Sequence, residues 1–164
     1  MAAGLPDLVD CARLAEEAAL LQREYELGKL PRLRDLLAEP RGTLSATFAF
    51  AKLPSGRPGV LVSIEAAPQL VCQRCLQGFG LRASGASEIE FATSEDPEDA
   101  ESEGEFFRME NGRVSLRELA EEELLLALPV VAAHDAPQDC GGAPTVASDR
   151  TRPFAGLQDL LKKT

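Results

Sequence analysis

The sequence has few aromatic residues and a shortage of positive charge, and each shortage excludes a class of protein. Only 5% of the 164 residues are aromatic and none is tryptophan. The chain therefore lacks the stacking surfaces on which proteins that coat single-stranded nucleic acid hold the bases. The formal net charge is −10, from 27 acidic and 17 basic residues. Such a charge repels polyphosphate unless the basic residues gather on one face, so a general DNA- or RNA-coating protein is excluded.

Long apolar runs and export signals are also missing. No stretch approaches the 18 apolar residues that suggest a membrane-spanning helix. The first 17 residues carry acids and no basic segment before an apolar run, which is unlike a signal peptide. We therefore expect a cytoplasmic protein with no membrane partner. The motifs of nucleotide-binding loops and of zinc proteases are absent as well, so nucleotide-driven chemistry is not expected and no small-molecule substrate is indicated.

The length and the 45% apolar content predict one domain with a core that needs no metal to fold. We predict a single α+β domain over residues 1–134. Residues 94–105 hold seven acids and no base, which predicts a disordered acidic loop within that domain. Residues 135–152 are rich in Gly, Pro, Ala and Ser and are predicted to be a flexible linker. Residues 153–164 form a short amphipathic segment.

Helical periodicity appears in three parts of the domain. Apolar residues recur at helical intervals over residues 6–22 and again after Pro31. The third helix is predicted over residues 115–128. It begins with the capping box Ser115 to Glu118 and ends before Pro129.

Between these helices the apolar pattern has a period of two. It covers residues 43–50 and 60–66, and the turn-forming residues between them predict an antiparallel hairpin. A further strand pattern starts at Phe79, is interrupted at Gly85 and resumes at Ile89. The predicted fold class is thus α+β, with an antiparallel β-meander over residues 43–92 packed against two or three helices.

Cys72 and Cys75 form the sharpest local motif. Two intervening residues allow both sulfurs to face one tetrahedral zinc ion, but a pair supplies only half of a site. His134 and Cys140 could complete it, although 64 residues separate Cys75 from Cys140. We expect Cys72 and Cys75 to lie at a strand-to-strand turn. Of the two outcomes, bound zinc and no tightly bound metal, we expect the second, because the core is large and the ligands are split between a turn and a linker.

Other interpretations of these residues remain. The cysteine pair could be a redox motif of the thioredoxin type, but glycines and a strand pattern follow it where a helix is required. Cysteines that bind nothing, or a Cys–His nucleophile built on His134, are further alternatives. The basic residues form three small groups, which are either an RNA-facing patch or scattered surface charge. Those groups are Arg32 and Arg34, then Arg74 and Arg82, then Arg150, Arg152, Lys162 and Lys163.

The C-terminal segment carries apolar residues at helical spacing but is too short to be a stable helix alone. We expect it to dock on the body or on a partner, because an exposed apolar cluster would favour aggregation. Its apolar residues are Phe154, Leu157, Leu160 and Leu161.

The combination of motifs resembles a known bacterial family, the large ribosomal RNA subunit accumulation proteins named after YceD. The residues that carry the resemblance are the CQRCL sequence Cys72, Gln73, Arg74, Cys75 and Leu76, the helix end at Leu128 and Pro129, and His134 and Cys140 downstream. The segment GKLPRLRDLL before the strand hairpin and the tail RPFAGLQDLLKK are also similar.

The resemblance implies a non-catalytic factor for the synthesis, processing or stability of 23S ribosomal RNA. Its partner would be that RNA or a large-subunit precursor particle, reached directly or through a ribosomal protein. Two rival functions remain: a zinc-stabilised adaptor that binds only protein, and a thiol oxidoreductase.

Overall fold

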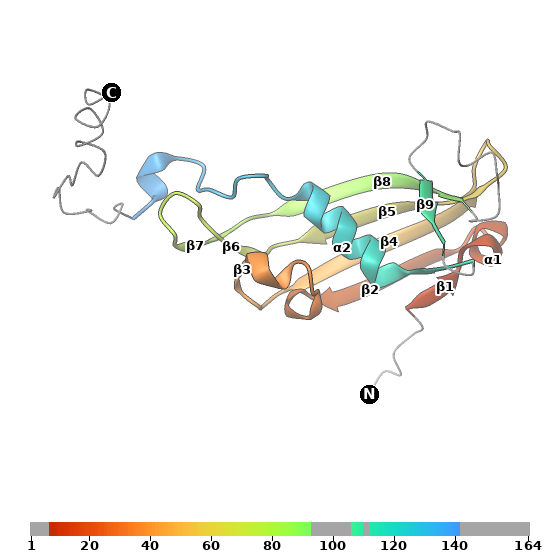
Figure 1. The fold of residues 1–164 in the computed structure, drawn as a ribbon, viewed down its shortest axis with the longest axis horizontal. Helices are drawn as coiled ribbons and strands as arrows, with labels where there is room; N and C mark the ends of the chain where they lie inside the picture. Colours follow the sequence, from red (N-terminus) through yellow and green to blue (C-terminus); the bar gives the residue numbers. More distant parts are fainter. Residues whose placement is uncertain (1–6, 93–105, 110–111, 142–164) are drawn as a thin grey trace, which may run out of the picture.

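A long twisted β-sheet forms the body of the protein, and one helix lies across it (Figure 1). The computed structural model describes residues 7–92, 106–109 and 112–141. The body sheet has the strand order β2-β4-β5-β8-β9. Its strands are β2 (Leu20–Glu26), β4 (Thr43–Lys52), β5 (Pro58–Ala66), β8 (Ala83–Ala92) and β9 (Phe106–Arg108).

Two smaller sheets lie at opposite ends of the body (Figure 1). One pairs β1 (Leu8–Asp10) with β10 (Arg113–Ser115). The other has the order β3-β6-β7, with β3 (Leu37–Glu39), β6 (Gln69–Val71) and β7 (Gly78–Gly80). The α-helices are α1 (Cys11–Glu16) and α2 (Leu116–Ala127), and short 3₁₀ turns are η1 (Leu27–Lys29), η2 (Arg34–Leu36) and η4 (Pro137–Asp139).

The predicted hairpin at the centre of the sheet is confirmed. β4 and β5 pair antiparallel from Leu44 opposite Ala66 to Lys52 opposite Pro58, and β8 continues the antiparallel arrangement on the other side of β5. β8 and β9 pair parallel over three residues, and the chain between them is long enough for the crossover that parallel neighbours require. The fold is therefore α+β and mainly antiparallel, as predicted.

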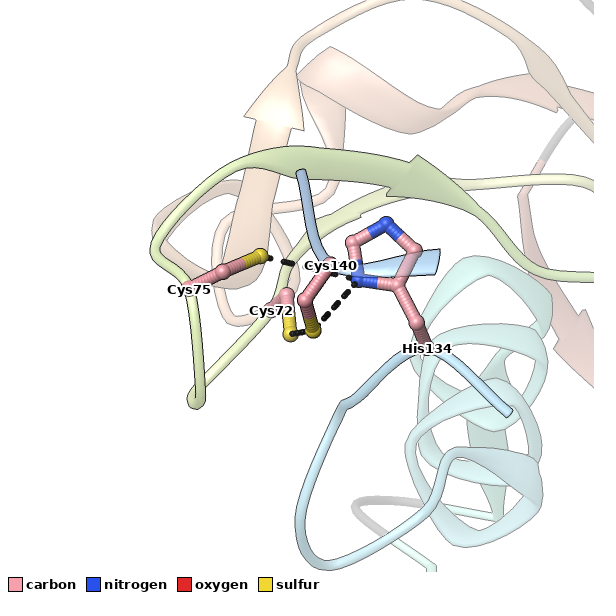
Figure 2. Close-up of side chains that lie close together, drawn as sticks. All are labelled: Cys72, Cys75, His134 and Cys140. Carbon is pink, nitrogen blue, oxygen red and sulfur yellow. Dashed lines mark hydrogen bonds between the residues drawn. The ribbon is translucent and has the colours of Figure 1, made fainter. Parts of the chain in front are cut away.

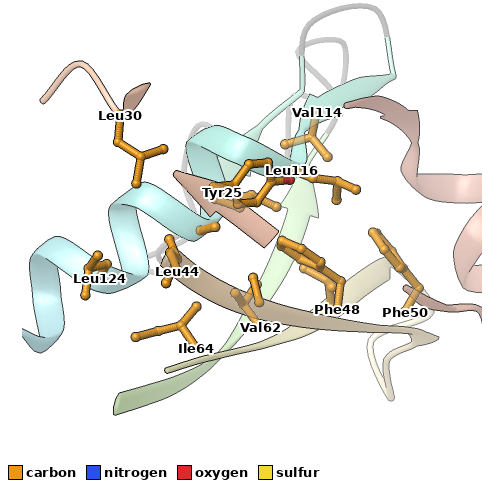
Figure 3. Close-up of a cluster of buried hydrophobic side chains, with 14 of the residues drawn as sticks. Tyr25, Leu30, Leu44, Phe48, Phe50, Val62, Ile64, Val114, Leu116 and Leu124 are labelled. Carbon is orange, nitrogen blue, oxygen red and sulfur yellow. The ribbon is translucent and has the colours of Figure 1, made fainter. Parts of the chain in front are cut away.

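The core lies between the sheet and α2. Figure 3 shows alternate residues of β4 and β5, including Phe48 and Val62, directed toward Leu116 and Leu124 of the helix. All four side chains are fully buried. Ser115 accepts a hydrogen bond from the Glu118 N–H and caps the start of α2, which confirms the predicted cap. The stripe of apolar residues at helical spacing thus buries the face that the sequence predicts.

The helix predicted over residues 6–22 is wrong in its extent. Only Cys11–Glu16 are helical, and Ala18 takes a positive φ of 47° that ends the helix. Residues from Leu20 onward form β2, which pairs with β4 along its whole length. The backbone bonds of this pairing outweigh a weak helical preference, because tertiary context overrides intrinsic propensity.

The helix predicted after Pro31 is also wrong. Its place is taken by the 3₁₀ turn η2, followed at Leu37 by β3, which pairs with β6. Leu33 is fully buried, whereas Leu36 is 49% exposed, so the leucines do not share one buried face. The backbone N–H groups of Arg32 and Leu33 donate to the buried carboxylate of Glu121 on α2, at 2.7 and 3.0 Å.

Gly85 does not interrupt β8, contrary to the sequence analysis. The strand is continuous, with Gly85 opposite Ile64 of β5. A Cβ atom at this position would lie 2.7 Å from Oε1 of Glu123, a contact that is too short. Glycine therefore allows α2 to approach the sheet closely here.

Candidate metal centre

The cysteine pair lies in the turn between β6 and β7, as predicted. The Cys72 N–H donates to the Gln77 carbonyl at 2.9 Å, and the Leu76 N–H donates to the Cys72 carbonyl at 2.8 Å. Leu76 has a φ of +61°, a conformation that costs energy for a residue with a bulky side chain. The Cys72 side chain is fully buried and Cys75 is only 6% exposed. The tight turn therefore directs both sulfurs inward.

The chain that follows α2 folds back over this turn. The Gln73 N–H donates to the Ala132 carbonyl at 2.8 Å. Arg74 donates through Nη2 to the carbonyls of His134 and Ala136, at 2.9 and 3.2 Å. The 3₁₀ turn η4 then places Cys140 beside the hairpin. Residues 135–141 of the predicted linker thus lie against the body, while the rest of that linker is outside the described residues.

Cys72, Cys75, His134 and Cys140 meet at one point (Figure 2). Their ligand atoms all lie within 4.8 Å of one another. Sγ of Cys140 lies 3.9 Å from Sγ of Cys72 and 3.5 Å from Nδ1 of His134, and Sγ of Cys75 lies 3.6 Å from the same Nδ1. In a tetrahedral zinc site with Zn–S bonds of about 2.3 Å, neighbouring sulfurs are about 3.8 Å apart. The observed spacing fits such a site.

Two residues outside the four candidate ligands, Phe79 and Arg74, contact them and hold them in position. Neither residue was predicted to have this role. The ring of Phe79, on β7, contacts the His134 imidazole with centroids 5.0 Å apart and a tilt of 38°. Nε of Arg74 donates to Sγ of Cys140 at 3.0 Å. Arg74 lies inside the CQRCL motif, so its position beside two ligands was a signal that could have been used.

The electrostatic environment favours a thiolate at Cys72. Burial by itself raises the pKa of this thiol, but hydrogen bonds from the backbone N–H groups of Cys75, His134 and Arg74 outweigh it and lower the pKa to about 5. At Cys75 the Gln77 N–H lowers the pKa, while burial and the neighbouring thiols raise it, and the net shift is upward. Thiolates are the form that binds metal.

Cys11 is set apart from this cluster. It begins α1 within the hydrophobic core and is fully buried. Burial and the neighbouring Asp10 carboxylate raise its pKa to about 12. Among the described residues it belongs to no group of possible metal ligands.

The remaining residues of the CQRCL motif and the helix end are more exposed. Leu76 is 72% exposed, Gln73 and Pro129 are exposed, and Leu128 is partly buried. The apolar tail residues Phe154, Leu157, Leu160 and Leu161 lie outside the described residues. Cys72 follows a strand and does not begin a helix, so the helix-dipole arrangement of a thioredoxin-like motif is not present at this pair.

The fold and the four clustered side chains define a small α+β protein with a Cys₃His constellation at one end. A family model described as the large ribosomal RNA subunit accumulation protein YceD matches residues 60–161. The chain belongs to this YceD family. The match includes the cysteine hairpin, α2, His134, Cys140 and most of the tail, and it starts after the GKLPRLRDLL segment. No curated protein and no solved structure gives a significant match.

No helix in the described ranges is both long and apolar enough to cross a membrane.

Proposed function

We propose that this protein is a non-catalytic factor for the synthesis, processing or stability of 23S ribosomal RNA, and that its Cys₃His constellation binds one structural Zn²⁺. The observation that carries the metal proposal is that ligands from two segments, 59 positions apart at Cys75 and His134, meet at tetrahedral spacing. Soft thiolates and an imidazole are the donors that zinc prefers, and a closed set of four leaves no open position for chemistry. The zinc would fix the segment after α2 on the hairpin.

The charges favour contact with a precursor particle over a broad RNA-binding face. Arg32 is paired with Glu122, Arg34 lies near Asp35, and Arg74 is engaged at the Cys₃His constellation. These three arginines are therefore partly neutralised within the chain. We propose that the large-subunit precursor particle is bound in the cytoplasm, through a ribosomal protein or through a local, salt-sensitive contact with RNA.

The family function is tested by depleting the protein and measuring the ratio of 23S to 16S RNA. We expect the ratio to fall, and expression of the wild-type chain to restore it. Cys72→Ser and Cys140→Ser should each restore it less well, whereas Cys11→Ala, at the thiol outside the cluster, is the matched control. An unchanged ratio on depletion would overturn the proposed role in RNA accumulation.

The metal is tested separately on protein purified without chelator. We expect about one zinc per chain in the wild type and in Cys11→Ala, with loss of the metal in both cluster variants. Wild-type protein that is free of metal and takes up none from a zinc buffer would show that the cluster is a packing element.

A further inference from the structure

An apolar groove lies beside the proposed zinc site. It has a volume of about 610 Å³ and is enclosed by three parts of the chain: η2 with β6, the end of α2, and residues 129–132. Leu36 and Leu70 form one wall, Leu125 and Leu128 form the second, and Val131 belongs to the third. The groove therefore combines segments that are distant in the sequence.

Three large apolar side chains at the rim of this groove are exposed to solvent. Val130 is fully exposed, Val131 is 64% exposed, and Leu36 on the opposite side is 49% exposed. Contiguous exposed apolar patches in soluble proteins mark binding sites. Among the residues that the structure describes, Asp35 is the one charged residue lining the groove, and it is paired with Arg34 at 3.7 Å.

We propose that the chain's own C-terminal segment, residues 153–164, docks in this groove as an amphipathic helix. Its four apolar residues, Phe154, Leu157, Leu160 and Leu161, have the spacing of one helix face. A helix of this length is marginal in water and becomes stable when its apolar face is buried. The groove offers the complementary apolar surface, in the way that grooves accept amphipathic helices in other complexes.

The end of the described chain lies close to the groove. A Cβ atom built on Gly141 would lie 3.3 Å from Oε1 of Gln77, so the described chain ends beside the hairpin turn that also contains the groove residue Gln73. The chain from Gln73 to Gln77 spans at most about 14 Å. A linker of the length of residues 142–152 would reach about 18 Å on average as a random coil and about 36 Å when extended. The segment therefore reaches the groove without strain. A tether of this length also gives the segment a local concentration in the millimolar range, which favours this occupant over a separate molecule.

The proposal rests on the proposed zinc site in one respect. Residues 130–132 form a wall of the groove, and they are held by the Gln73 to Ala132 hydrogen bond and by the ligands that follow. Removal of zinc should therefore loosen that wall and weaken docking.

The test uses the full chain with Phe154 replaced by the photo-crosslinking residue p-benzoylphenylalanine. After irradiation of the monomer, we expect mass spectrometry to find crosslinks from position 154 to peptides that contain Leu36 or Val131. Val131→Asp should reduce the yield at least about tenfold, since a charge would have to be buried in place of an apolar side chain. Leu61→Asp is the matched control, because Leu61 is a similarly exposed apolar residue on β5 that does not line the groove. It should leave the yield unchanged.

Crosslinks only between two chains would replace this occupant with a second copy and overturn the proposal. Absence of groove crosslinks, or an equal loss in both aspartate variants, would also overturn it. Zinc content is measured on the same samples. Stoichiometric zinc without groove crosslinks refutes docking and leaves the metal proposal standing, whereas groove crosslinks in protein that holds no zinc and takes up none from a zinc buffer refute the metal proposal alone.

Discussion

Replacing Arg74 with glutamine should weaken zinc binding without unfolding the protein. The guanidinium group makes three contacts with the segment that supplies half of the ligands: the Cys140 sulfur at 3.0 Å and the carbonyls of His134 and Ala136 at 2.9 and 3.2 Å. Three thiolates, one neutral imidazole and one Zn²⁺ carry a net charge of −1. In the proposed site Arg74 would neutralise this charge, and its hydrogen bond to the sulfur orients Cys140; a glutamine side chain would supply neither the charge nor the same contacts.

The expected loss in zinc affinity is between about 10-fold and 100-fold, which is typical when an outer partner of metal ligands is removed. We place Arg74→Gln toward the upper end, because one side chain contacts a ligand sulfur and the backbone of a second ligand. Arg74→Lys keeps the charge but cannot form the same fork of hydrogen bonds, so its loss should be intermediate.

The assay is competition for zinc with a chromophoric chelator, which gives an apparent dissociation constant for each variant. Arg82→Gln is the control, because Arg82 is an exposed arginine just after the same hairpin. Thermal unfolding of the zinc-free forms checks that the sheet is unaffected. An affinity for Arg74→Gln within twofold of the wild type, or an equal loss in Arg82→Gln, would refute the proposed role of Arg74.

Two further predictions concern the body of the protein. Glu121→Ala should lower the free energy of unfolding by about 3 kcal/mol, because the N–H groups of Arg32 and Leu33 lose their buried acceptor. Glu122→Ala removes only an exposed ion pair with Arg32 and should change little in the same urea titration, so equal effects would contradict the assignment. Stability should fall as the pH rises from 9 toward 12, since the folded pKa of Cys11 is raised to about 12 from 9.0 and the unfolded chain loses this proton first. Each pH unit contributes up to about 1.4 kcal/mol, and a Cys11→Ala variant with an equally steep decline would show that other groups cause it.

The parts of the fold that the sequence predicts well are those that local pattern determines. The alternating residues of β4 and β5 and the cap at Ser115 need no knowledge of distant contacts. The helix predicted over residues 6–22 fails because the backbone of Leu20–Glu26 pairs with β4, a contact that helical periodicity does not reveal. The helix predicted after Pro31 fails for a similar reason, since the amide groups of Arg32 and Leu33, just before η2, donate to Glu121 on a helix almost 90 positions away.

The residues of the candidate site could be predicted from the sequence, but their meeting in space could not. The residue types and the turn at Cys72 follow from spacing, and the sequence analysis named all four members of the cluster. The sequence alone favours no tightly bound metal, because the core is large and the ligands are divided between a turn and the predicted linker over residues 135–152. The contacts of Arg74 and Gln73 with that segment arise only once α2 has brought it over the hairpin. A contact between segments this far apart in the sequence produces no periodic pattern of apolar residues from which it could be predicted.

The separation of the two ligand pairs also sets an order of events in folding. Cys72 and Cys140 are 68 positions apart, and β8 and α2 lie between them in the sequence. Bringing such distant residues together has an entropic cost that earlier contacts must offset, so we expect the sheet and α2 to form before the four side chains meet. During synthesis from the N-terminus the fourth ligand arrives only when residue 140 has emerged. If the proposed zinc is bound, its tight binding therefore comes late in synthesis, and a chain that stops before residue 140 should lose zinc to a chelator that the full chain resists.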